Sequence, residues 1–358
     1  MKKGILMILV MKVGASKDEI DATINQIKEW GHDVSLAPGE KQTVIGIIGD
    51  KSDLGGRPLS TLPGVSKVLE VSAPYKRASR GFHPEDTIVD VNGVKIGGGH
   101  KCVIAGPCSV DTLENVVYLA KVAKENGAKM LRGGAYKPRT SPYTFQGHEE
   151  EGLKMMAEAR KETGLPIVTE LMSIRDIDTV YKYADVIQIG ARNSQNFPLL
   201  KEIGKLNKPV ILKNGIAGTM KEHLMSAEYI MSEGNEDVIL CLRGTRTFET
   251  AVRNTIDVTL VPVMQQLTHL PIIIDPSHAA GKRPFVSSLA YAGMAVGADG
   301  LIIEIHNCPK EALSDGDQAL LPRDFEYLMK KLDNLVAWNQ KEWFEFDKTK
   351  DTDCIKVS

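Results

Sequence analysis

The sequence predicts a (β/α)8 TIM barrel, an α/β fold, preceded by a small α+β ferredoxin-like domain. From residue 101 onward, eight apolar segments recur, mostly starting about 20 to 40 residues apart, with helix-like sequence between them. Continuous apolar runs, rather than alternation, indicate strands that are covered on both faces and are therefore parallel. Eight strand–helix units over about 240 residues match a closed barrel. A doubly wound sheet is the alternative, but the even spacing of the units favours closure.

The first 75 residues predict the small domain. The apolar run 5–11 is strand-like, and residues 16–30 carry apolar side chains at a helical spacing, with Ser16 as N-cap and Gly31 at the end. Two strands at 32–39 and 43–50, a short helical segment near 59–62 and a strand at 65–71 complete the order β-α-β-β-α-β. That order is typical of a ferredoxin-like domain, which does not by itself specify a function.

The rest of the chain divides into a polar, Gly-rich linker at 76–100, the barrel at 101–340 and a C-terminal tail at 341–358. The predicted barrel strands are 102–108, 128–134, 166–171, 186–191, 209–215, 237–244, 271–277 and 300–306. The intervening segments are helix-like, as at 112–127.

Composition excludes several classes of protein. Lys and Arg total 44 and Asp and Glu total 46, so the net charge of −2 argues against a broad basic surface for nucleic acid. No stretch reaches the roughly 18 apolar residues that a membrane helix needs. The start has the basic and apolar parts of a signal peptide, but Lys12 interrupts the apolar run, and a strand explains it better. Five irregularly spaced cysteines without a CxxC motif indicate a reducing, cytoplasmic location.

Cations follow the predicted barrel strands. They are Arg132, Lys137, Arg139, Arg192, Lys213 and Arg243. Active sites of such barrels lie at the C-terminal ends of the strands. Six cations at one mouth repel each other and require several anions, and Arg and Lys are suited to phosphate and carboxylate. The alternative is that they are rim residues paired with Asp and Glu.

A second set of residues follows strands 1, 7 and 8, which are neighbours in a closed barrel. Cys108, His278, Glu304 and Asp315 together offer a thiolate, an imidazole and two carboxylates. Such a mixed set binds a divalent transition metal without selecting sharply among manganese, iron, cobalt and zinc. The alternatives are a buried core cysteine and an ordinary loop histidine.

Several strings resemble 3-deoxy-D-arabino-heptulosonate 7-phosphate (DAHP) synthase of the type I beta subfamily. They are AGPCS (105–109), LRGGAYKPRTSPYTFQG (131–147), IQIGARN (187–193), LCLRGTRTFE (240–249), DPSH (275–278) and LSDG (313–316). The resemblance covers nearly the whole chain and includes the family's ferredoxin-like (ACT-like) regulatory domain. It implies a transferase that condenses phosphoenolpyruvate with erythrose 4-phosphate at the start of the shikimate pathway, a homotetramer, and inhibition by tyrosine or phenylalanine. The bland alternative for the N-terminal domain is a structural or oligomerisation role.

The resemblance also implies roles for particular residues. The metal ligands fall on Cys108, His278, Glu304 and Asp315, with Mn²⁺ as the first expectation and Co²⁺, Fe²⁺ or Zn²⁺ as alternatives. The phosphoenolpyruvate contacts fall on Arg132, Lys137, Arg192, Lys213 and Arg243. The erythrose 4-phosphate contacts fall on Lys137, Pro138, Arg139, Thr140 and Asp315. As hypotheses, Lys137 and His278 donate protons and Glu170 orients the water.

Three alternatives to this function stay open in the sequence. The sister enzyme 3-deoxy-D-manno-octulosonate 8-phosphate synthase uses arabinose 5-phosphate, but typically has KANRS where this chain has KPRTS (137–141). A non-catalytic sensor of phosphorylated metabolites would tolerate loss of the metal and cation sets, which are intact. A metal-dependent aldolase would not need so many anion-binding groups.

Two features depart from the family pattern. Cys308 follows the last strand and could form a disulfide with Cys108, with an ordinary loop thiol as the alternative. The tail at 341–358 extends past the usual end, with Trp343, Phe344 and Phe346 available to pack on the barrel or on a neighbouring subunit.

Overall fold

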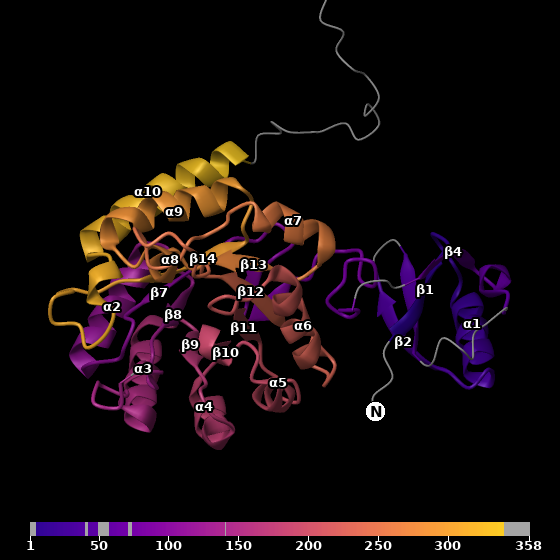
Figure 1. Cartoon of the computed structure of the whole chain (residues 1–358), viewed down its shortest axis with the longest axis horizontal. Helices are drawn as coiled ribbons and strands as arrows, with labels where there is room; N and C mark the ends of the chain where they lie inside the picture. Colours follow the sequence, from indigo (N-terminus) through magenta and orange to yellow (C-terminus); the bar gives the residue numbers. More distant parts are fainter. Residues whose placement is uncertain (1–4, 40–41, 49–56, 71–73, 140, 340–358) are drawn as a thin grey trace, which may run out of the picture.

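The computed structural model describes residues 5–39, 42–48, 57–70, 74–139 and 141–339 of the 358-residue chain. The N-terminal domain is an antiparallel sheet of order β2-β3-β1-β4 beside the barrel (Figure 1). Its elements are β1 (Ile5–Met11), α1 (Lys17–Glu29), β2 (Asp33–Pro38), β3 (Thr43–Ile48) and β4 (Val65–Glu70). The ferredoxin-like prediction is confirmed, although within the described residues the second helix is only the 3-10 turn η2 (Leu59–Thr61).

Helix α1 begins where the sequence predicts it. The Ser16 hydroxyl accepts from the Glu19 backbone N–H, and the Glu19 carboxylate accepts from the Ser16 N–H, which completes a capping box. Gly31 follows the helix with a φ of +85°, a conformation that glycine adopts without strain. The apolar side of α1, including Ile27, packs against Leu9 and Ile45 of the sheet.

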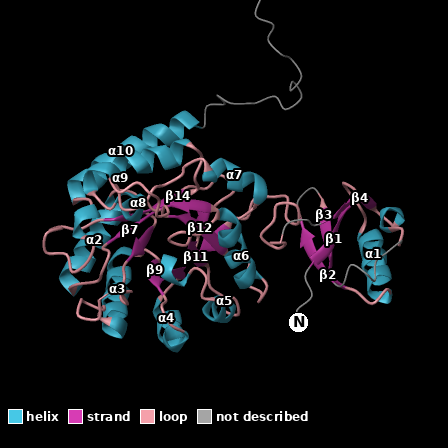
Figure 2. Ribbon diagram, in the orientation of Figure 1, coloured by secondary structure: helices cyan, strands magenta, loops and turns pink. Residues whose placement is uncertain are grey.

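The barrel has eight parallel strands in a closed ring, as predicted, with helices around it (Figure 2). The strands are β7 (Cys102–Gly106), β8 (Met130–Arg132), β9 (Ile167–Glu170), β10 (Val186–Ile189), β11 (Val210–Lys213), β12 (Val238–Leu242), β13 (Ile272–Ile274) and β14 (Gly300–Glu304). The surrounding helices are α2 (Leu113–Glu125), α3 (Glu149–Thr163), α4 (Ile177–Tyr183), α5 (Phe197–Ile203), α6 (Met220–Met231), α7 (Leu260–Leu267), α8 (Pro276–Ala280), α9 (Arg283–Ala295) and α10 (Pro322–Asn339). Among the described residues, none of the helices is both long and apolar enough to cross a bilayer.

The interior of the barrel has an apolar layer with a polar layer above it. The apolar layer includes Met130, Val168, Val186, Ile211, Cys241, Ile273 and Ile302. Side chains along a strand alternate between the two faces, so the residue two positions further on also points inward. In these seven strands that residue is polar: Arg132, Glu170, Gln188, Lys213, Arg243, Asp275 and Glu304. The strand period therefore places a ring of polar and charged groups at the C-terminal mouth.

The connection at 76–100 is more than the polar linker that the sequence analysis predicts. It contains a hairpin of β5 (Val89–Val91) and β6 (Val94–Ile96), whose buried side chains pack against the apolar layer at the N-terminal end of the barrel. The prediction missed this hairpin although the sequence carries a signal for it: apolar and polar residues alternate on both sides of Asn92 and Gly93, a pair typical of two-residue hairpin turns. The hairpin forms the floor of the barrel.

The first part of the same connection joins the two domains. The backbone N–H groups of Lys76 and Ala78 both donate to one carboxylate oxygen of Glu228 on α6. A few residues later, Phe82 packs against Ile8 and Val44 of the N-terminal sheet. The segment thus contacts the barrel on one side and the N-terminal domain on the other.

We expect Ile96→Ala to lower the free energy of unfolding by about 2–5 kcal/mol, because it leaves a cavity beneath the barrel. Ile96 is fully buried in the floor. Lys95→Ala on the same strand changes an exposed side chain and should stay within about 0.5 kcal/mol of the parent. Urea unfolding followed by far-ultraviolet circular dichroism measures both, and equal stability of the two variants would contradict the role of the floor.

Candidate active site

The mouth of the barrel contains a cavity of about 320 Å³, near the lower end of the range for small-molecule sites. Most of the residues expected from the sequence line it: Arg132, Lys137, Pro138, Arg139, Glu170, Arg192, Lys213, Arg243, His278 and Asp315. Thr140 lies outside the described residues. The six cations and two of the four expected metal ligands, His278 and Asp315, therefore line one cavity.

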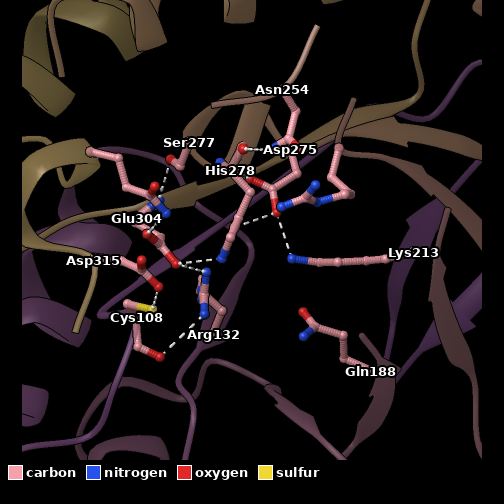
Figure 3. A network of polar contacts seen from close by, with 12 residues as sticks. Cys108, Arg132, Gln188, Lys213, Asn254, Asp275, Ser277, His278, Glu304 and Asp315 are labelled. Carbon is pink, nitrogen blue, oxygen red and sulfur yellow. Dashed lines mark hydrogen bonds and ion pairs between the residues drawn. The ribbon is translucent and has the colours of Figure 1, made fainter. Parts of the chain in front are cut away.

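The four expected metal ligands come together from four separate segments (Figure 3). Cys108 follows β7, His278 lies on α8, Glu304 ends β14 and Asp315 precedes the 3-10 turn η5 (Gly316–Gln318). One ligand atom from each lies within 4.8 Å of the others. Among the described residues, this is the group of His, Cys, Asp and Glu side chains with the spacing of a metal site. The donor set fits a divalent transition metal.

Two buried cations, Lys137 and Arg132, donate hydrogen bonds to members of the cluster. The Lys137 ammonium donates to the Cys108 sulfur and to its carbonyl oxygen, each at 3.0 Å. The Arg132 guanidinium donates to Glu304 at 2.7 Å and to the Cys108 carbonyl at 3.3 Å. Burial, followed by the charge of Glu304, raises the pKa of the Cys108 thiol to about 12. Burial also works against ionisation of Glu304, but His278 and Arg132 outweigh it and lower the pKa of that carboxyl.

Asp275 fixes the orientation of two of these groups. Its carboxylate is fully buried and accepts from the Lys213 ammonium and from His278 Nδ1 at 2.8 Å. The His278 and Lys213 charges overcome the effect of burial and hold the pKa of Asp275 well below its usual value. With Nδ1 donating to Asp275, the other nitrogen of His278 faces Glu304 Oε1 at 3.4 Å. This is the arrangement that carboxylates commonly impose on metal-binding histidines.

Several donors at the mouth have no acceptor in the described part of the chain. Arg132 Nε and Arg243 Nη1 are both buried and without a hydrogen-bond partner there. Among the described residues, only two of the six cations are paired with a carboxylate: Arg132 with Glu304, and Lys213 with Asp275. The alternative of six rim residues neutralised by Asp and Glu therefore fails. Buried donors of this kind need an acceptor from outside the chain, such as a ligand oxygen or a water molecule.

Four further residues of the site have no role predicted from the sequence: Gln188, Arg253, Asp275 and Gln318. Gln188 and Asp275 were detectable, because each lies two positions beyond an inward apolar residue of its strand. Arg253 lies in the loop after β12 and Gln318 in the 3-10 turn η5, and no local pattern marks either residue. The suggested Cys108–Cys308 disulfide is not formed, since both thiols are free.

Comparison with known proteins shows the family of the chain. The DAHP synthetase I family model matches residues 85–338, and the model of the DAHP synthase ferredoxin-like domain matches residues 7–73. The chain belongs to the DAHP synthetase I family. The resemblance inferred from the sequence motifs is thus confirmed, and this family is metal-dependent.

Individual relatives show how far the family likeness extends. The phospho-2-dehydro-3-deoxyheptonate aldolase of Thermotoga maritima is 49% identical over 326 residues, which are 91% of this chain and 95% of that protein. The crystal structure of the Thermotoga maritima DAHP synthase matches with a TM-score of 0.74 at 46% identity, covering 94% of this chain and 98% of that one. The 2-dehydro-3-deoxyphosphooctonate aldolase of Geobacter sulfurreducens is 30% identical, over 70% of this chain and 97% of that protein.

We expect Asp275→Asn to destabilise this family member by about 3–5 kcal/mol, because it leaves the buried Lys213 without its counter-charge. Asp317→Asn, at an exposed position of η5, should stay within about 0.5 kcal/mol of the parent. Urea unfolding curves of both variants measure the difference. An Asp275 variant as stable as the control would show that Lys213 finds compensation elsewhere.

Proposed function

We propose that the chain is a DAHP synthase: it condenses phosphoenolpyruvate with erythrose 4-phosphate and water to give DAHP and phosphate. The observation that supports this most is the surplus of cations at the barrel mouth, where Arg132 Nε and Arg243 Nη1 are buried and find no acceptor among the described residues. The two substrates bring two phosphates and one carboxylate, which match those donors. We assign phosphoenolpyruvate to Arg132, Lys137, Arg192, Lys213 and Arg243.

The acceptor is the point at which the sister enzyme differs. The segment 137–141 reads KPRTS and its first residues, Lys137, Pro138 and Arg139, line the cavity. We assign these residues, together with Thr140 and Asp315, to erythrose 4-phosphate. The higher identity to the Thermotoga heptonate aldolase than to the Geobacter octonate aldolase supports the same choice.

The metal site fits this chemistry. We propose Cys108, His278, Glu304 and Asp315 as ligands of a divalent ion, with manganese as the first choice. When bound, such an ion supplies Lewis acidity toward the aldehyde oxygen of the acceptor. The cations then hold the enol carbon of phosphoenolpyruvate near that aldehyde carbon, so that a carbon–carbon bond forms, water adds at C2 and phosphate leaves by C–O cleavage.

Two residues are placed to move protons. Lys137 lines the cavity and its ammonium reaches Cys108, so it can donate to the oxygen that forms from the aldehyde. Both nitrogens of His278 are engaged, one by Asp275 and the other at the ligand cluster, which makes Lys137 the better donor. Glu170 accepts from Gln188 at 3.3 Å and faces the cavity, where we propose that it orients the attacking water.

The N-terminal domain carries the regulatory proposal. Its match to the ferredoxin-like domain of DAHP synthases supports binding of an aromatic amino acid, tyrosine or phenylalanine, and control of the barrel from a distinct site. We further propose a homotetramer in the cytoplasm. The contacts of residues 76–82 with both domains offer a physical route for this coupling.

The direct test is the loss of phosphoenolpyruvate absorbance with each acceptor sugar. We expect turnover with erythrose 4-phosphate, its loss in a chelator and its return with manganese. Turnover with arabinose 5-phosphate instead would identify the sister reaction. A folded, metal-loaded protein that turns over neither sugar would favour a sensor.

We expect Cys108→Ala to lose its bound metal and, with it, at least about 100-fold in activity. The reason is that the change removes the sulfur ligand, one of the four expected ligands. Cys308→Ala is the matched control, since this half-buried thiol lies outside the ligand cluster. Metal analysis after gel filtration and the absorbance assay measure both effects. Full activity of the Cys108 variant in chelator would contradict the metal role.

Tyrosine or phenylalanine should lower the turnover of the full chain and leave a chain that begins at residue 74 unaffected. The expectation follows from placing the effector site in the N-terminal domain. A structure of a truncated form of the Thermotoga maritima DAHP synthase matches 74% of this chain at 47% identity, which supports the feasibility of such a variant. Equal inhibition of both chains would place the effector in the barrel.

A further inference from the structure

The loop between β12 and α7 is joined to the helix that carries His278. The backbone N–H groups of Arg253 and Asn254 donate to the carbonyls of Ala280 and Ala279, at 3.2 and 3.0 Å. The Asn254 side chain donates to the His278 carbonyl at 2.7 Å (Figure 3). Gly281 permits this approach, because a Cβ there would lie 2.3 Å from that of Arg253.

From this fixed backbone, the Arg253 side chain reaches two further segments. Its Nη1 donates to Asp315 Oδ1 at 2.8 Å and to Gln318 Oε1 at 3.0 Å. The amide nitrogen of Gln318 in turn donates to Glu304 Oε2 at 2.6 Å. Gln318 is buried, so both ends of its amide are used inside the protein. One path of hydrogen bonds therefore connects Asp315, Arg253, Gln318 and Glu304.

This path holds one oxygen of each carboxylate and leaves the other at the ligand cluster. Asp315 Oδ1 is held by Arg253, while its Oδ2 faces the Cys108 sulfur at 3.2 Å. Glu304 Oε2 is held by Gln318, while its Oε1 accepts from Arg132 and faces His278 Nε2 at the cluster. Asp315 also has a φ of 52°, which is uncommon for a residue with a side chain, so its position depends on the contacts around it.

We propose that Arg253 and Gln318 act as one positioning unit that orients Asp315 and Glu304 as metal ligands, while Asn254 fixes the helix of His278. The inference rests on the proposed metal site and adds residues that do not themselves bind the metal. Residues that hydrogen-bond metal ligands typically affect metal affinity by about 10- to 100-fold. The unit draws one loop, one turn and one strand end into a single arrangement.

The test is a Co²⁺ titration of the full chain, read from the thiolate-to-cobalt charge-transfer band and the visible d–d bands. We expect Arg253→Met and Gln318→Met each to raise the dissociation constant about 10- to 100-fold and to shift the d–d bands, because the carboxylate geometry relaxes. The dissociation constant of the double variant should be close to that of the weaker-binding single variant, since both residues act through one path. Arg253→Lys should bind Co²⁺ more tightly than Arg253→Met, because an ammonium can still donate to Asp315. It should bind less tightly than the parent, because lysine lacks the planar guanidinium group.

Arg246→Met and Gln266→Met are the controls, because both side chains are exposed and outside the cluster. Both should bind Co²⁺ as the parent does. Thermal melting of the metal-free proteins separates misfolding from lost positioning, and if the Arg253 variant does not fold, the Gln318 variant still decides.

Parent-like affinity and d–d bands in the folded Arg253 and Gln318 variants would overturn the inference. If the KM for erythrose 4-phosphate rises in Arg253→Met with an unchanged cobalt site, Arg253 contacts substrate instead, and the inference is equally wrong. A parent protein that shows no thiolate-to-cobalt band would overturn the metal site itself and this inference with it.

Discussion

Charged side chains are buried inside a closed barrel, and their pairing sets the geometry of the mouth. Side chains alternate along each strand, so charged groups lie directly above an apolar layer. Burying each of these charges without a partner would lower the stability of the fold. Arg132 against Glu304 and Lys213 against Asp275 meet that cost in pairs. The pairing also fixes where these side chains point, so the ligand cluster and the anion-binding groups keep their relative positions.

The cations exceed what the described carboxylates neutralise, and this surplus gives the mouth its chemistry. Arg132 Nε and Arg243 Nη1 are buried donors that no described residue of the chain satisfies, so they are available to a ligand. A metal at the cluster would carry positive charge toward the same space, so anionic substrates are favoured twice. The neighbouring cations in turn lower the pKa of the buried carboxyl groups of Asp275 and Glu304, which keeps both groups ionised.

The segments that connect elements contribute as much to the architecture as the strands do. Residues 76–100 anchor to α6, contact the N-terminal sheet and end as the floor of the barrel. The β12–α7 loop reaches α8, Asp315 and, through Gln318, Glu304. Apart from the alternating apolar residues of β5 and β6, neither segment has a regular apolar pattern. Their structure follows from the partners that the barrel provides.

The barrel, the ferredoxin-like domain and most of the residues at the mouth were predictable from the sequence. Apolar runs predict strands, and side chains that alternate along a strand place the residue at its end. The folded chain was needed to identify Val89 and Ile96 as floor residues and to bring Arg253 and Gln318 together. Those positions depend on contacts between segments distant in the chain, such as Gln318 and Arg253, and no local pattern encodes such a contact.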